Sequence, residues 1–234
     1  MNLRYELDRL NNPSTVIIVG RGHSGTRLIT QLLSKNGVFL GNTNDSYDMV
    51  PADHMYDAAK EFGLCVEYVP PLQWHIKNMP PTESYMRYLY EYLYPLLGHD
   101  GMVGWKLPET IFSLPWIISI FPNAKYLYWS KNPMHIMSRW HISDNLNSWG
   151  VQCDCLDPIE MRASSILYQL RMMNSYKPKH YFDVDAEFFV KSHNHAVEWI
   201  SGFIGKQLSS LNNIDADRAH RPSACNTLVD EFVR

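Results

Sequence analysis

A run of glycines with hydroxyl and basic side chains near the start of the chain has the residue types of an anion-binding loop. Four β-branched apolar residues at positions 16–19 predict a short buried strand just before it. Leucines at positions 28, 32 and 33 predict a helix just after it. Glycine lets the backbone approach an anion closely, and the free N–H groups at a helix start point toward it. The predicted phosphate-binding residues are Arg21, Gly22, His23, Ser24, Gly25, Thr26 and Arg27.

This loop differs from the common nucleotide-binding loop that ends in Gly-Lys-Ser/Thr, in which the lysine reaches the terminal phosphates. Here the corresponding residues are Ser24, Gly25, Thr26 and Arg27, without a lysine. An ordinary strand-to-helix turn, with glycines required only by its geometry, is the alternative. A phosphate site is favoured because a strand and a helix are both predicted where such a site needs them.

Two further basic elements follow predicted strands later in the chain. Lys106 ends a strand predicted at 102–106, and Lys131 and Arg139 follow a strand predicted at 124–129. In an open α/β sheet, ligands bind outside the carboxyl ends of the strands. We therefore expect all three basic elements to face one crevice.

The order of the predicted elements favours an α/β fold, a single domain over residues 1–234 with a central parallel β-sheet flanked by helices. A short strand at 38–40 and a last strand at 181–184 complete the sheet, and residues 70–81 are predicted to form a long loop. The predicted helices cover residues 2–10, 25–36, 55–62, 82–97, 133–140, 157–175 and 196–204, and a further helix has Pro108 and Glu109 in its first turn.

Composition limits the possible functions. Of the 234 residues, 45% are hydrophobic and 19% are charged, which is typical of a globular protein. The formal net charge of −3 argues against a general nucleic-acid binder. No signal peptide and no membrane-spanning stretch is recognisable, and a cytoplasmic protein is expected. The tail after Ser209 is polar, and its Arg218, His220 and Arg221 lie close together in the sequence.

The cysteines do not have the spacing of a zinc site. Cys153 and Cys155 are too close together for a usual zinc knuckle, and no second pair completes four ligands. Free thiols in a reducing compartment are the expected state for all four cysteines, which are Cys65, Cys153, Cys155 and Cys225.

Three motifs together resemble the sulfotransferases that use 3′-phosphoadenosine 5′-phosphosulfate (PAPS). The loop at 22–26 resembles their Pro-Arg/Lys-Ser-Gly-Thr loop, and residues 122–133 with Ser138 resemble the strand, Arg-Asp-Pro and helical serine of their second signature. Lys106, shortly before Pro108, is similar to the lysine that many members carry between these motifs. The order and rough spacing match from about residue 14 to 140.

This resemblance implies a P-loop-containing nucleotide-binding fold, PAPS as the donor and adenosine 3′,5′-bisphosphate (PAP) as its product, with no metal required. Residues 21–27 would hold the 5′-phosphosulfate, and Lys106 would stabilise the leaving phosphate or the transferring sulfuryl group. Lys131, Ser138 and Arg139 would hold the 3′-phosphate. The acceptor would be a hydroxyl or amine of a small molecule, carbohydrate or lipid.

The sequence departs from the family pattern at four points. His23 replaces the usual arginine or lysine, and Lys131 replaces the usual arginine. Ser138 falls one position early, so that Arg139 stands where the family serine does. Leu107 and the proline after it stand where cytosolic members place a histidine. Either Ser138 or Arg139, or both, could therefore contact the 3′-phosphate.

Sulfuryl transfer to a hydroxyl also needs a general base within reach of the acceptor. Asp53 and His54 rank first because they follow the loop next to the anion site, and Asp48, His75 and Glu109 are the alternatives. Two other functions compete with this interpretation. A P-loop kinase would share the first loop but needs a lysine there, and a non-catalytic nucleotide-binding module would not need Lys106.

Overall fold

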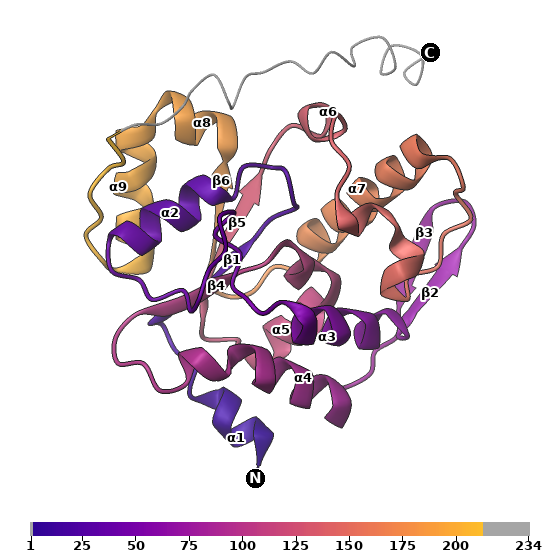
Figure 1. Cartoon of the computed structure of the whole chain (residues 1–234), viewed down its shortest axis with the longest axis horizontal. Helices are drawn as coiled ribbons and strands as arrows, with labels where there is room; N and C mark the ends of the chain where they lie inside the picture. The colour runs from indigo at the N-terminus through magenta and orange to yellow at the C-terminus, as the bar shows by residue number, and fades with distance from the viewer. Residues whose placement is uncertain (1, 213–234) are drawn as a thin grey trace.

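In a computed structural model of the chain, which describes residues 2–212, four parallel strands form the central sheet in the order β4-β1-β5-β6 (Figure 1). These strands are β1 (Thr15–Val19), β4 (Val103–Lys106), β5 (Lys125–Ser130) and β6 (Tyr181–Asp185). β1 lies between β4 and β5, with Ile18 opposite both Lys106 and Leu127. The carboxyl ends of the three strands that precede the predicted basic elements are therefore neighbours, as expected.

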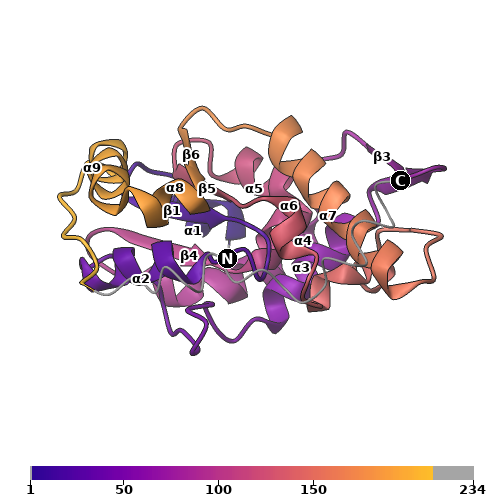
Figure 2. The ribbon, with the colours of Figure 1, turned by 90° about the horizontal axis from the view of Figure 1, so that it is seen from above.

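Side chains of β1 point alternately into two cores, because successive residues of a strand face opposite sides of the sheet. Val16 and Ile18 pack against α2 (Arg27–Lys35), α8 (Ala186–Lys191) and α9 (His193–Ile204). Ile17 and Val19 belong to the larger core with α3 (Asp53–Gly63), α4 (Glu83–Leu93), α5 (Leu114–Ile120) and α7 (Pro158–Ser175). Figures 1 and 2 show these two groups of helices on opposite sides of the sheet, which confirms the α/β prediction.

The remaining elements are short. The helix α1 (Leu3–Asp8) packs against α4, and α6 (Pro133–Ile136) is a single turn after β5. Turns of 3₁₀ helix cover η1 (Tyr94–Leu96), η2 (Pro108–Ser113), η3 (Ile142–Asp144) and η4 (Leu146–Trp149). The tyrosines Tyr85 and Tyr92 of α4 are buried and belong to the core.

Three local predictions were wrong. Residues 70–81 are not a continuous loop, since β2 (Val66–Val69) and β3 (Gln73–Ile76) form an antiparallel hairpin beside α7. The helix expected through residue 140 ends at Ile136. The strand expected at 38–40 is reduced to one bridge, between Phe39 and Val103. The polar tail with Arg218, His220 and Arg221, and Cys225 within it, lies outside the described residues.

Candidate functional site

The loop between β1 and α2 has the backbone of an anion cradle. Gly25 has a φ of +93°, a conformation that favours glycine, just before the first turn of α2. A Cβ at Gly20 would lie 2.6 Å from the Thr26 methyl group and 3.0 Å from Trp129, so the loop also needs glycine there for close packing. The indole of Trp129 donates to the carbonyl of Ser24 over 2.9 Å. The loop is thus fixed from β5, with the start of α2 presented at the carboxyl edge of the sheet.

Arg21 does not offer a free charge to a ligand, although the sequence placed it in the phosphate site. Its side chain is only 5% exposed, and its guanidinium forms an ion pair with Asp144, which is fully buried. A second bond holds the carbonyl of Gly22. Burial is the main cause that lowers the pKa of Arg21, and the Asp144 carboxylate opposes this shift. Arg21 therefore stabilises the loop through its contacts with Asp144 and the Gly22 carbonyl.

His23 is the exposed basic residue at the tip of the loop. Its φ of +61° is uncommon for a residue other than glycine, and its Nε2–H donates to the carbonyl of Trp140 over 2.8 Å. Burial lowers the pKa of His23, and the charges of Arg21 and Arg139 lower it further. The imidazole is therefore neutral at pH 7 here, and it contributes a hydrogen bond where the sequence suggested a charge.

Lys106 lies at the end of β4 with its amine enclosed. The residue is 3% exposed, and its Nζ donates to the Ser46 carbonyl over 2.9 Å and forms an ion pair with Asp48. Arg27 donates to the hydroxyl of the same Ser46 over 3.2 Å. The segment 42–50 is therefore held by basic side chains from both β4 and α2. Burial lowers the pKa of Lys106, and Asp48 acts in the opposite direction.

Glu109 adds a buried acid beside this lysine. It is 1% exposed, and its Oε1 has no hydrogen-bond partner among the described residues. Burial raises its pKa to about 7, and the Asp48 carboxylate adds to the shift. His141 Nδ1 lies 3.8 Å away, but burial and nearby Arg21 lower the pKa of His141 to about 3. Between about pH 3 and pH 7 both groups are neutral, so this contact is not an ion pair in that range.

The predicted 3′-phosphate residues lie after the end of β5. Lys131 directly follows the strand, and Ser138 and Arg139 follow α6 in an irregular segment. Within residues 2–212, neither Lys131 nor Arg139 forms an ion pair or a side-chain hydrogen bond. Burial lowers the pKa of Lys131, and nearby Arg139 lowers it further. Two basic side chains thus lie close together and form no ion pair with a described carboxylate, although the charge of Glu187 is near enough to oppose the shift of the Lys131 pKa.

The general bases that the sequence predicted lie in three different environments. His54 lies 3.1 Å from Glu91 of α4 through its Nδ1, so it is engaged on the α3–α4 side. Asp53 is exposed in the first turn of α3, and its charge acts on Tyr56 together with those of Asp48 and Glu109. His75 is exposed on the β2–β3 hairpin, away from the loop.

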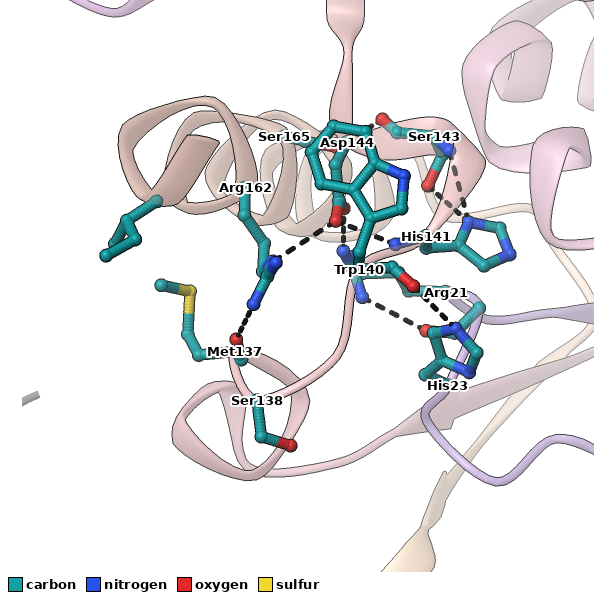
Figure 3. A network of polar contacts seen from close by, with 12 residues as sticks. Arg21, His23, Met137, Ser138, Trp140, His141, Ser143, Asp144, Arg162 and Ser165 are labelled. Atoms are coloured by element: carbon teal, nitrogen blue, oxygen red, sulfur yellow. Dashed lines mark hydrogen bonds and ion pairs between the residues drawn. The ribbon is translucent and has the colours of Figure 1, made fainter. Parts of the chain in front are cut away.

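Two residues of the site were not predicted from the sequence. Asp144, in η3, and Arg162, on α7, form a buried ionic group with Arg21 (Figure 3). Arg162 Nε lies 3.3 Å from Asp144 Oδ2. No local sequence pattern marks either residue, because the ionic group depends on contacts between residues far apart in the sequence.

A surface groove also lies away from this loop. It is lined by residues of α1 and α4 together with Phe39 and His99. Phe39 bridges Val103 at the amino end of β4, so this groove lies at the opposite edge of the sheet from Lys106. Among the described residues, no group of three or more His, Cys, Asp or Glu could hold a metal ion. Within the same residues, none of the helices is both long and apolar enough to cross a membrane.

Comparisons with known proteins identify the fold and the family of the chain. The chain is similar to the sulfotransferase from Alicyclobacillus acidocaldarius, with 16% identity and a TM-score of 0.52 over 93% of this chain and 90% of that one. It is also similar to the sulfotransferase domain of the Synechococcus PCC 7002 olefin synthase, with 18% identity and a TM-score of 0.52 over 94% and 84%. At these identities the likeness shows the fold alone. No curated protein sequence matches significantly. A family model described as "Sulfotransferase family" matches residues 13–210, and the chain belongs to that family.

Proposed function

We propose that this sulfotransferase takes its sulfuryl group from PAPS and transfers it to a hydroxyl or amine of a small-molecule, carbohydrate or lipid acceptor. The observation that carries the proposal is the pair Lys131 and Arg139 beside the loop, which forms no ion pair among the described residues. Arg139 is close enough to lower the pKa of His23 as well as that of Lys131. A donor with phosphate groups at both its 3′ and 5′ positions would match two anion sites at one sheet edge.

The chain divides the donor between two segments. The loop amides, Ser24, Thr26 and Arg27 would hold the 5′-phosphosulfate at the start of α2, where the helix dipole favours an anion. Lys131, Ser138 and Arg139 would hold the 3′-phosphate. The Ser138 hydroxyl makes only a long 3.4 Å bond to the His135 carbonyl, which leaves it able to donate to a phosphate oxygen.

Transfer requires a positioned acceptor and a group that stabilises charge on the leaving oxygen. During transfer, the bond between the sulfur atom of the donor and its 5′-phosphate oxygen breaks, while the acceptor oxygen or nitrogen forms a bond to that sulfur atom. The electron pair of the broken bond stays on the phosphate, and the acceptor proton leaves to a base. Lys106, whose amine lies beside the loop, would stabilise the negative charge that develops on that phosphate oxygen.

Asp48 is our proposed base, ahead of Asp53 and His54. Its carboxylate contacts Lys106 and its side chain is 18% exposed, so an acceptor can reach it. Glu109 is close but only 1% exposed. A general base typically contributes 10²–10⁴-fold to the rate, so D48N should lower kcat by about 10²-fold or more. H54N serves as the control, and a D48N variant with wild-type kcat would reject this assignment.

The donor is tested by ligand-dependent thermal unfolding. A ligand that binds only the native state at 100 times its Kd stabilises it by about 2.7 kcal/mol. PAP should therefore raise the Tm more than ATP with Mg²⁺ or NAD does. Equal or greater stabilisation by ATP with Mg²⁺ would contradict the proposal and favour the kinase alternative. PAP binding without transfer to any acceptor would favour the non-catalytic module.

A further inference from the structure

The irregular segment at 137–141, which carries the proposed 3′-phosphate residues, is held in place by side chains far away in the sequence. Arg162 of α7 donates through Nη1 to the carbonyl of Met137. His23 of the loop donates to the carbonyl of Trp140 over 2.8 Å. Outside a helix these carbonyls have no regular backbone partners, so the side chains decide where the segment lies (Figure 3).

One buried carboxylate joins this segment to the loop. Asp144 accepts from Arg21 through Oδ1 and from both Arg162 and the backbone N–H of His141 through Oδ2, over 3.3 Å and 2.8 Å. Its side chain is fully buried. A buried carboxylate is stable only when it is well paired, and here one donor comes from each of the loop, the segment and α7.

Arg162 occupies the central place in this arrangement. Its side chain is 16% exposed, its guanidinium bridges Asp144 and Met137, and its Cζ lies 5.9 Å from the centre of the Trp140 ring. Figure 3 shows the guanidinium between the carboxylate of Asp144 and the end of α6, with Ser138 just beyond it. An arginine can make this bridge because its donors are arranged in a rigid planar fork.

We propose that Arg162 is a positioning residue that places Ser138 and Arg139 for the 3′-phosphate, and that Asp144 ties this placement to the 5′-phosphate loop. The inference rests on the donor proposed above. Arg162 itself touches no phosphate in this scheme, since its fork is occupied by Asp144 and Met137. Loss of the bridge should therefore weaken recognition of the 3′-phosphate selectively.

The test compares the Kd values of PAP and of adenosine 5′-monophosphate (AMP), which lacks the 3′-phosphate, by titration calorimetry. Wild-type protein should bind PAP more tightly. R162M keeps the aliphatic stem and leaves Asp144 paired with Arg21. It should reduce the PAP-over-AMP preference by about tenfold, the scale of one lost charge-assisted hydrogen bond, while the Kd of AMP changes less than threefold.

Arg171 provides a matched control on the same helix. It also donates to a backbone carbonyl, that of Leu72, and lies over the Trp74 ring, but it serves the β2–β3 hairpin. R171M should leave the PAP-over-AMP ratio unchanged. A purely structural role for Arg162 would instead weaken PAP and AMP equally.

R162K covers the case in which R162M does not fold. It keeps a charge beside Asp144 but lacks the fork that also reaches Met137, so its ratio should fall as well. A PAP preference that persists in R162M or R162K overturns the positioning role alone. A wild-type protein that binds PAP and AMP equally overturns the proposed donor, and with it the 3′-phosphate role of the segment.

Discussion

Glu109→Gln should remove a pH dependence from the stability of the protein. Burial raises the pKa of Glu109 from 4.5 to about 7 in the native state. Between these two pH values the native state holds a proton that the unfolded state has lost. Because the native state binds more protons, the free energy of unfolding of the wild type falls as the pH rises through this window.

The size of the effect follows from the two pKa values. Each pKa unit corresponds to about 1.4 kcal/mol, and the unfolded carboxyl is already mostly ionised at pH 5. Linkage then gives a loss of about 2.5 kcal/mol between pH 5 and pH 8 from Glu109 alone. Glutamine keeps the shape of the protonated acid and does not titrate. E109Q should therefore gain about 2.5 kcal/mol relative to wild type over the same interval.

Urea unfolding followed by fluorescence at pH 5 and pH 8 measures both free energies. The difference between variant and wild type cancels the contributions of other groups, including that of His141, whose pKa lies near 3. Glu198 is an exposed glutamate of α9, and E198Q should follow the wild type at both pH values. If the advantage of E109Q is equal at pH 5 and pH 8, the raised pKa of Glu109 is wrong.

Two further outcomes test the site. K106A should lower kcat by about 10²-fold, the scale of one lost preorganised donor, with a much smaller change in PAP affinity. R27A should instead mainly weaken PAP binding. If K106A keeps the wild-type kcat, another residue must stabilise the leaving phosphate. G22A should unfold at a lower temperature than wild type, because its Cβ would overlap the His141 ring. In the control G202A, the new Cβ meets open space in α9. G202A should therefore leave the free energy of unfolding unchanged or raise it by up to about 1 kcal/mol. A G22A variant with wild-type Tm would show that the ring of His141 can move aside.

The parts of the site that the sequence predicted are those coded by local pattern. A β-branched run, two glycines and a helical repeat predict the loop without any knowledge of distant residues. The expectation that Lys106 and Lys131 lie at the same end of one parallel sheet followed from a general rule for such sheets, and the strand order confirms that their strands flank β1.

The parts that it missed depend on contacts between distant residues. The helix after β5 ends at Ile136, and beyond it Met137 and Trp140 accept hydrogen bonds from residues 25 and 117 positions away. The hairpin residues Gln73–Ile76 alternate between exposed and half-buried positions in a region rich in proline, so turn signals outweighed the strand signal. The role of Asp144 can be recognised only from its ion pairs with Arg21 and with Arg162 of α7.

Charge pairing separates the roles of the basic residues at this edge of the sheet. The buried cations Arg21 and Lys106 each face an aspartate, so an incoming anion would have to share them with an existing partner. Lys131 and Arg139 form no ion pair among the described residues, and only the charge of Glu187 acts on Lys131 from nearby, so an anion there would displace no existing ion pair. Ground-state affinity should therefore come mainly from Lys131, Arg139 and Arg27, which also forms no ion pair within the described residues. Lys106 is then left to act on charge that appears only during transfer, which is the use of binding energy that accelerates a reaction.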